Sequence, residues 1–217
     1  MKKYMLSLLF LAILQGSLIS LIAQDIILPA PDRTGGKPLM QALSERQTTR
    51  SFTKDSLTLQ QLSDLLWAGF GINRPDQGKR TAPSAMNWQE IEIYVTLSRG
   101  SYVYSADSHS LKFINNKDLR KETGSQDFVA DAAMNIVYVA DLSKRGRKEG
   151  EEVKDADLFM TYADAAFIAQ NIYLYCASAN LGCVVRGSVP DTSLASELGL
   201  KTSQRIIMEH TVGVPKR

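Results

Sequence analysis

Histidine and cysteine are scarce in this chain of 217 residues, which contains two of each. Two cysteines, Cys176 and Cys183, are too few for a disulfide framework, and a bridge would have to join a helix end to a strand start. We expect both to be small core residues instead. His109 and His210 are far apart in the sequence and lie among strand-like residues, which disfavours a zinc site or a Ser-His-Asp triad.

Two nucleotide-recognition signals are also missing. Gly69 and Gly71 lack the third glycine of a dinucleotide-binding fingerprint, and they follow a helical pattern instead of standing between a strand and a helix. The formal net charge is +2, and no segment after the first 23 residues concentrates lysine and arginine. The composition therefore predicts that nucleic acid is not a partner.

The segment 1–23 has the pattern of a secretory signal peptide. Two lysines precede an unbroken apolar run at 8–14, and the small residue Ala23 stands before Gln24. Polar or small residues at 15–17 leave the apolar stretch short of the roughly 20 residues that a spanning helix needs. We therefore expect cleavage after Ala23, export to the periplasm, and no stable membrane insertion of the mature protein.

The rest of the chain divides into an N-terminal arm at 24–37 and a single domain at 38–217. Pro29, Pro31 and the glycine pair at 35–36 favour an extended arm over a regular element, and such an arm often wraps the partner in a dimer. The domain has no internal repeat, and helical patterns alternate with strand patterns. This alternation predicts an α+β or α/β fold.

Helix signals are clearest at three places. Pro38 can open a helix that ends near Arg46, because a proline in the first turn loses no hydrogen bond. Thr58 begins a capping-box pattern ahead of a leucine-rich amphipathic repeat. The segment 158–180 is free of glycine and proline and is apolar on most faces, which predicts a central buried helix that Gly182 ends.

Strands are predicted where apolar and polar residues alternate or where a short apolar run occurs. The charged stretch 143–157 is expected to be a solvated loop, with a mobile lid as the alternative, and its adjacent glutamates at 151–152 are expected to be surface residues. The expected strands lie at 91–97, 102–104, 111–114, 136–140, 183–185 and 206–214, with a short helix at 193–198.

The segment 46–52 is the strongest candidate for a binding site. Arg46, Thr48 and Arg50 alternate where a helix gives way to extended chain, so all three side chains project to one side. Guanidinium groups offer bidentate, permanently charged donors that suit a phosphate, and the hydroxyl adds a neutral donor. The alternative is a solvated, arginine-rich helix end.

Three further segments could line a site. Small residues at 80–89 would let the backbone approach a flat ligand, or they could form an ordinary turn before a strand. At 180–187, Gly187 could present its N–H to a ring atom that gains and loses a proton or hydride, or the segment could be a plain helix-to-strand turn. The chain ends at 212–217 with two more cations, which could also belong to a frayed terminus.

Together these motifs resemble the nitroreductase family. They are Arg-Gln-Thr-Thr-Arg-Ser-Phe at 46–52, Pro-Ser-Ala-Met-Asn-Trp-Gln at 83–89, the long helix ending in Asn-Leu-Gly at 180–182, and Val-Gly-Val-Pro at 212–215. The similarity covers nearly all of 38–217, and the motifs occur in the family's order. Within the family, the branch that contains the thiazole- and oxazole-forming peptide dehydrogenases looks most similar, on the segments 65–72, 80–84, 102–104 and 110–111.

The resemblance implies an α+β, nitroreductase-like fold, with a central, mostly antiparallel sheet flanked by helices. It also implies a homodimer with FMN at the subunit interface. Arg46, Thr48 and Arg50 match the positions that hold the FMN phosphate and the ring edge in the family. Lys216 matches a C-terminal contact to the phosphate.

The remaining implied roles concern the flavin ring. Pro83, Ser84, Ala85 and Asn87 match the stretch that a partner subunit contributes to the same flavin. The backbone of Arg186 and Gly187 matches the turn beside the reactive N5 atom. No catalytic side chain is expected, because the cofactor carries the reaction and the protein supplies orientation and main-chain hydrogen bonds.

Two departures from the family pattern bear on function. The peptide dehydrogenase branch is associated with a Lys-Tyr catalytic pair ahead of the long helix, and the only such pair here is Lys3-Tyr4, in the expected signal peptide. Azole formation is therefore disfavoured. Family members usually draw electrons from NAD(P)H, a cytosolic reductant, whereas this chain is expected to leave the cytosol, so its electron donor stays open.

We therefore expect an FMN-dependent oxidoreductase that passes hydride or electrons through flavin N5 to a small organic acceptor such as a quinone or nitro compound. One alternative is a flavin- or ligand-binding protein of the same fold without turnover. Another is a peptide-modifying dehydrogenase, in which Lys154, just ahead of the long helix, would replace the missing Lys-Tyr pair.

Overall fold

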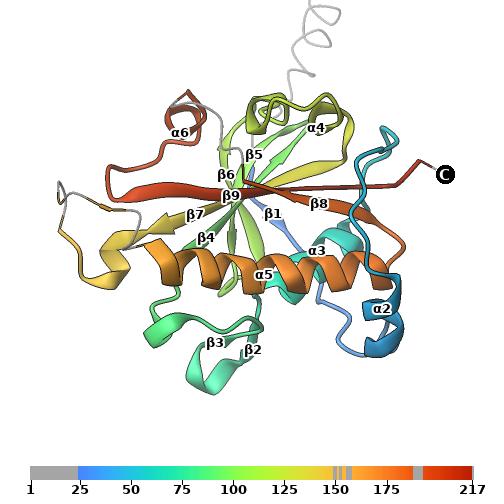
Figure 1. Cartoon of the computed structure of the whole chain (residues 1–217), viewed down its shortest axis with the longest axis horizontal. Coiled ribbons are helices and arrows are strands. Elements are labelled where there is room, and N and C mark those ends of the chain that lie inside the picture. Colours follow the sequence, from blue (N-terminus) through green and yellow to red (C-terminus); the bar gives the residue numbers. More distant parts are fainter. Residues whose placement is uncertain (1–23, 149–150, 152, 155–157, 188–192, 217) are drawn as a thin grey trace, which may run out of the picture.

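The computed structural model describes residues 24–148, 151, 153–154, 158–187 and 193–216. The expected signal peptide at 1–23 lies outside the described residues. A seven-stranded sheet forms the centre of the molecule, and every neighbouring pair of its strands is antiparallel, which confirms the α+β class (Figure 1). The spatial order is β1 (Ile26–Ile27), β6 (Ser110–Asn115), β5 (Gly100–Ser105), β4 (Ile91–Leu97), β7 (Met134–Asp141), β9 (Gln204–Gly213) and β8 (Gly182–Arg186).

Helices cover both faces of this sheet (Figure 1). The long helix α5 (Phe159–Ser178) runs across one face and packs on α3 (Leu59–Phe70) and α2 (Leu39–Glu45). On the opposite face lie the short helices α4 (Phe128–Asp131) and α6 (Ser193–Glu197). The remaining elements are the hairpin β2 (Ile72–Arg74) and β3 (Lys79–Arg80), and the 3-10 helices η1 (Pro75–Gln77), η2 (Ala85–Asn87), η3 (Lys121–Thr123) and η4 (Leu142–Arg145).

The central strand β7 shows how the two faces are filled. Successive side chains of a strand point to opposite faces. Ile136 and Tyr138 accordingly join the core beneath α3 and α5, whereas Val137 and Val139 pack with Leu194 of α6. Burial on both sides explains why this strand reads as a continuous apolar run in the sequence.

Helix α3 begins as its capping-box pattern predicts. The Gln61 N–H donates to Oγ1 of Thr58 (3.1 Å), and the Thr58 N–H donates to Oε1 of Gln61 (2.9 Å). These two bonds satisfy main-chain donors that the first turn leaves open. Leu65 and Leu66 then bury their side chains completely or nearly so beneath the sheet.

The N-terminal arm differs from expectation because part of it is a strand of the chain's own sheet. Ile26 pairs with Leu111 and Ile27 pairs with Ser110, so β1 extends the sheet at the β6 edge. The arm then continues along α3, where the Ser63 hydroxyl donates to the Pro29 carbonyl (2.6 Å). The rest of the arm at 28–37 contains no helix or strand, and its pairing at β1 depends on an open partner strand, which the arm's sequence cannot show.

The end of α5 also differs from the prediction. Asn180, not Gly182, adopts the left-handed conformation that stops the helix (φ +57°). The Leu181 N–H then donates back to the Cys176 carbonyl (2.8 Å), which closes the last turn. Gly182 is the first residue of β8. Asparagine tolerates this conformation better than most residues, so it could replace the expected glycine.

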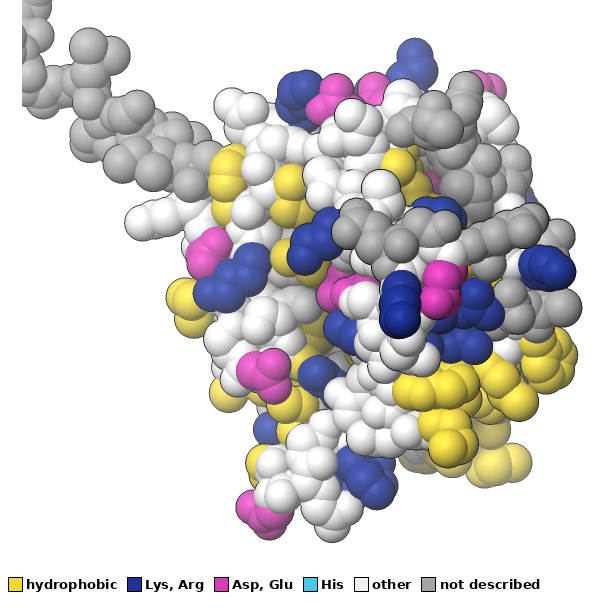
Figure 2. Space-filling model, turned by 90° about the vertical axis from the view of Figure 1, so that its left-hand side faces the viewer, with side chains coloured by type: hydrophobic (Ala, Val, Ile, Leu, Met, Phe, Trp, Pro, Cys, Tyr) yellow, Lys and Arg dark blue, Asp and Glu magenta, His cyan; other side chains and the backbone are white. Residues whose placement is uncertain are grey.

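Helix α5 is buried on one face only within this chain. Ala165, Ile168 and Ile172 are buried against the sheet, whereas Phe159 is 69% exposed and Phe167 is 49% exposed. Figure 2 shows apolar side chains gathered on the surface at the end of the molecule where α5 begins. Among the described residues, no helix combines the length and the apolar character needed to cross a membrane.

Candidate functional site

The segment 46–52 leaves α2 and runs beside β8. Arg46 ends the helix with a non-helical backbone (φ −56°, ψ 120°), and the Thr49 N–H donates to the Cys183 carbonyl (2.9 Å). Gly182 permits this close approach, because a Cβ atom there would stand 2.8 Å from Cγ2 of Thr49. The segment is therefore held by the sheet, although it is not itself a sheet strand.

The end of the chain pairs with the same segment. The Thr53 N–H donates to the Val214 carbonyl (2.8 Å), and the Lys216 N–H donates to the Ser51 carbonyl (3.0 Å). Phe52 is buried between these bonds, in a bridge with Pro215. Two segments from opposite ends of the domain thus lie side by side, and Lys216 comes to the 46–52 segment.

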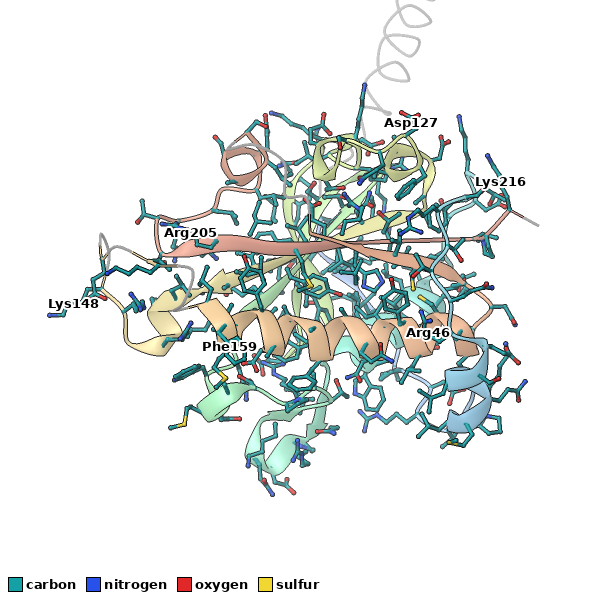
Figure 3. The ribbon with its side chains drawn as sticks, viewed as in Figure 1. Arg46, Asp127, Lys148, Phe159, Arg205 and Lys216 are labelled. Atoms are coloured by element: carbon teal, nitrogen blue, oxygen red, sulfur yellow. The ribbon has the colours of Figure 1, made fainter. Side chains whose placement is uncertain are left out.

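Three cations lie on the 46–52 segment and on the chain beside it, and none forms an ion pair among the described residues. Among the described residues, no carboxylate forms an ion pair with Arg46, Arg50 or Lys216. Arg46 and Lys216 stand at the end of the molecule where α5 terminates (Figure 3). Lys37 is also near, but its ammonium group is bound by Glu45 (2.6 Å). Unpaired, accessible guanidinium groups are suited to binding a phosphate.

A recess of about 510 Å³ opens beside Arg46. Its walls are the end of α2, the chain at 46–49, the last turn of α5 and Pro215. Cys176 and Leu181 contribute apolar surface, and Arg46 contributes charge. The recess therefore combines a mostly polar and charged lining with a smaller apolar part.

Tyr173 of α5 is a site residue that the sequence did not reveal. Its hydroxyl accepts the Val185 N–H (3.0 Å) and lies 3.2 Å from Oγ1 of Thr48. Its ring lies beneath the Arg46 guanidinium, at 5.4 Å from the ring centroid. One side chain thus links the helix, β8 and two residues of the 46–52 segment. A tyrosine in an apolar helix carries no signal of this role in the sequence.

The segment 83–89 has a distinctive backbone. Met86, Asn87 and Gln89 all have positive φ angles (50°, 56° and 49°), a conformation that costs free energy in non-glycine residues. Met86 is 83% exposed at the tip. The Ser84 hydroxyl accepts the Gln89 N–H (2.8 Å), so it closes the loop internally.

A buried acidic pair holds this loop on α5. The Ala85 N–H donates to both carboxylate oxygens of Asp164 (2.8 and 3.1 Å). Glu90, fully buried, accepts from the Thr161 hydroxyl (3.2 Å) and from the Ser84 hydroxyl (3.4 Å). Burial raises the pKa of Glu90, and the nearby negative charge of Asp164 raises it further.

The two halves of the predicted site lie apart within one chain. Asp164 anchors the 83–89 loop near the start of α5, whereas Tyr173 anchors the 46–52 segment near its end. Nine residues of helix separate these anchors, which is roughly 13 Å at 1.5 Å per residue. The chain therefore places Lys216 beside the 46–52 segment, and it holds the loop of Pro83, Ser84, Ala85 and Asn87 elsewhere along α5.

The predicted turn at Arg186 and Gly187 is only partly available to a ligand. The Arg186 guanidinium points into the protein, where it pairs with Glu209 (2.9 Å) and donates to the Thr123 carbonyl. Burial raises the pKa of Glu209, and the positive charge of Arg186 opposes that shift. Gly187 is exposed at the end of the described strand. Only the backbone of this turn can therefore serve a cofactor.

The fold and this edge define an α+β domain with a candidate phosphate-binding site. Comparison with known proteins makes the assignment specific. The model of the nitroreductase family matches residues 43–214. A nitroreductase homologue from Methanocaldococcus jannaschii is 28% identical over 180 residues, which are 78% of this chain and 88% of that protein.

Solved structures give the same result. A nitroreductase homologue from Ralstonia eutropha JMP134 is 41% identical, with a TM-score of 0.81 over 89% of this chain and 90% of that one. A nitroreductase homologue from Desulfovibrio desulfuricans, solved in complex with FMN, shares the fold at 18% identity, with a TM-score of 0.59 over 84% of this chain and 89% of that one. The chain belongs to the nitroreductase family.

Proposed function

We propose that the protein binds FMN in a homodimer and passes hydride or electrons through flavin N5 to a small organic acceptor, such as a quinone or nitro compound. We also propose that it acts outside the cytosol, in the periplasm, because its first 23 residues have the pattern of a secretory signal peptide. The observation that carries the proposal is that Arg46 lines a recess of about 510 Å³, while Arg46, Arg50 and the adjoining Lys216 form no ion pair among the described residues.

The phosphate of FMN is assigned to these three cations. A phosphate carries two negative charges near neutral pH and accepts bidentate hydrogen bonds from guanidinium groups. Thr48 adds a hydroxyl donor on the same side of the segment, and Tyr173 orients it (3.2 Å). The flavin ring would then lie over the recess, toward the exposed backbone at Gly187.

We propose a homodimer because the 46–52 segment and the 83–89 loop lie apart within one chain, whereas the proposed flavin site needs both. Exposed apolar side chains at Leu39 and Met40 of α2 and at Phe159 and Phe167 of α5 provide a surface that a second copy would bury. In a two-fold dimer, the 83–87 loop of one protomer could then reach the flavin held by Arg46 of the other.

The flavin supplies the redox chemistry when bound. The chain's residues bind the phosphate, exclude water and hold the ring against main-chain donors. A ping-pong cycle of flavin reduction and reoxidation is the expected kinetic form.

The test is the flavin content of the purified protein and of the double variant Arg46→Ala/Arg50→Ala. Wild-type protein should be yellow, should bleach with a reductant and should recover its colour with a quinone or nitroaromatic. The double variant should lose at least 90% of its flavin while it stays folded by circular dichroism. Lys54→Ala, which removes a nearby exposed cation, is the matched control and should keep its flavin.

Two results would contradict the proposal. Unchanged flavin content in the double variant would show that the phosphate lies elsewhere. Yellow protein that does not turn over with any acceptor would favour a flavin-binding protein of the same fold over an enzyme.

A further inference from the structure

The core next to the recess contains a group of reactive side chains that the flavin assignment does not use, and Cys176 of this group lines the recess itself. In the antiparallel pair of β8 and β9, Cys183 lies opposite Val212, and Val185 lies opposite His210. Alternate residues of a strand share a face, so Cys183 and His210 point to the same side of the sheet. That side faces α5, because the ring of Tyr173 in α5 lies 4.9 Å from the ring of His210.

Cys176 belongs to α5, the helix that covers this side of the sheet. Both cysteines are free thiols, and each is 1% exposed. The turn at Asn180 and the bond from the Leu181 N–H to the Cys176 carbonyl fold β8 back toward the last turns of α5. The two thiols therefore share one part of the core, although seven residues separate them in the sequence.

One ring nitrogen of His210 has no hydrogen-bond partner among the described residues. Its Nδ1 lies 3.0 Å from the Tyr138 hydroxyl, whereas its Nε2 is buried and has no hydrogen-bond partner of standard geometry among the described residues. A buried donor or acceptor without a partner is uncommon in folded proteins. His210 is one of the groups that lower the pKa of the nearby Cys183.

The surroundings shift the pKa values of the two thiols in opposite directions. Hydrogen bonding from Cys176, together with His210 and the charge of Arg46, lowers the pKa of Cys183. Burial raises the pKa of Cys176. A thiolate beside a protonated thiol is the arrangement that thiol–disulfide chemistry uses, because the thiolate is the nucleophile. Two cysteines that served only as small core residues would not need an imidazole and a guanidinium beside them.

The pair is also connected to the proposed flavin site. Cys176 lines the recess of about 510 Å³ together with Arg46 and Thr49. Thr49 in turn binds the Cys183 carbonyl through its N–H (2.9 Å). A flavin held by Arg46 would therefore lie next to the thiols.

We propose that Cys176 and Cys183 form a redox-active dithiol that closes to an intramolecular disulfide and exchanges electrons with the bound flavin. The inference rests on the proposed flavin site. In the oxidising direction, an S–S bond forms, two S–H bonds break, and two electrons and two protons reduce FMN to FMNH₂. In the reverse direction, FMNH₂ returns the two electrons and two protons and the S–S bond breaks. The described structure is the dithiol form.

The first test counts thiols. Holoprotein would be exposed to air or to excess reductant, unfolded in denaturant and alkylated, and its mass would be measured. We expect no alkylated cysteine in the oxidised sample and two in the reduced sample. Two alkylated cysteines in both samples would overturn the proposal. Unfolding is required because neither thiol is accessible in the folded protein.

The second test measures electron uptake during an anaerobic titration of oxidised holoprotein with dithionite. Wild-type protein should take up four electrons for each flavin, two for the flavin and two for the disulfide. Cys183→Ser and Cys176→Ser should each take up two. Ala179→Ser, which adds a hydroxyl to the same end of α5 and keeps both thiols, should still take up four. Uptake of two electrons by wild-type protein would refute the proposal.

Failure of the flavin site would be recognised separately. Colourless protein that ignores added FMN would contradict the proposed function itself. In that case, equilibration of the apoprotein with glutathione disulfide still decides whether the thiols pair, because the thiol count does not depend on flavin. Flavin-containing protein with two permanent thiols would refute the dithiol alone.

Discussion

Asp164 accepts the main-chain N–H of Ala85 with both of its carboxylate oxygens, at 2.8 and 3.1 Å, and is itself almost fully buried. This contact fixes a loop whose backbone is strained at Met86, Asn87 and Gln89. In the proposed dimer, the same loop encloses the partner's flavin. The Asp164 carboxylate therefore holds the loop in the strained shape that the proposed flavin site uses.

Replacing Asp164 by alanine should loosen this loop. The Ala85 N–H loses a charged acceptor, which we expect to cost about 1–3 kcal/mol of unfolding free energy. Flavin should bind about tenfold more weakly, as a loss of 1.4 kcal/mol implies. Denaturant unfolding and fluorescence titration with FMN measure the two effects. Asp127→Ala, at an exposed position on the opposite side of the sheet, should change neither.

The close approach at Gly182 leads to a second prediction. In Gly182→Ala, the new Cβ would lie 2.8 Å from Cγ2 of Thr49, so the 46–52 segment must move away from β8. We expect a loss of about 1–3 kcal/mol in stability and loss of bound flavin. Gly187→Ala, where no atom of the described residues lies within 4 Å of the added Cβ, serves as a stability control. Equal stability of the two variants would show that the contact is not tight.

His109 ties the N-terminal arm to the sheet and gives a pH-dependent prediction. Its Nε2 lies 2.6 Å from the Ser63 hydroxyl and its Nδ1 lies 2.9 Å from the Tyr104 hydroxyl. Burial lowers the pKa of His109, with the charge of Arg33 lowering it further and Asp64 opposing that shift. The unfolded chain therefore binds the proton more tightly than the folded chain.

This difference in pKa decides how the stability of the folded protein changes with pH. The stability contributed by neutral His109 is present above its usual pKa of 6.5 and is lost as the pH falls through the lower folded value. Thermal unfolding measured between pH 7.5 and 5 should show this loss in wild-type protein. His109→Gln should show a flatter pH profile. An identical slope in both proteins would assign the effect to other groups.

The exposed apolar face of α5 provides the prediction on oligomeric state. Phe167→Asp places a charge on a residue that is 49% exposed in one chain and that the proposed dimer would bury. The variant should be monomeric by analytical ultracentrifugation, and it should lose flavin because the partner's 83–87 loop is no longer supplied. Ile27→Asp, at an exposed position of the edge strand β1, should stay dimeric. A wild-type protein that is monomeric would contradict the dimer directly.

The sequence by itself determined the elements whose signals are local. The capping box at Thr58 and Gln61 formed because both partners lie within one turn. The alternation at 91–97 and the apolar run at 136–140 each gave a strand because the side-chain period is a property of the strand itself. The cationic segment at 46–52 was likewise visible, since three residues at alternate positions carry the pattern.

Only the tertiary structure decided which groups meet. Arg186 forms a buried ion pair with Glu209. Asp164 binds the main chain at Ala85, and the ring of Tyr173 lies beneath Arg46. Each pair is far apart in the chain, so no period or short motif records it. Edge pairing by β1 and the exposed face of α5 depend in the same way on what lies opposite them. Long-range pairing is set by how the sheet and helices pack, and packing is a property of the whole chain.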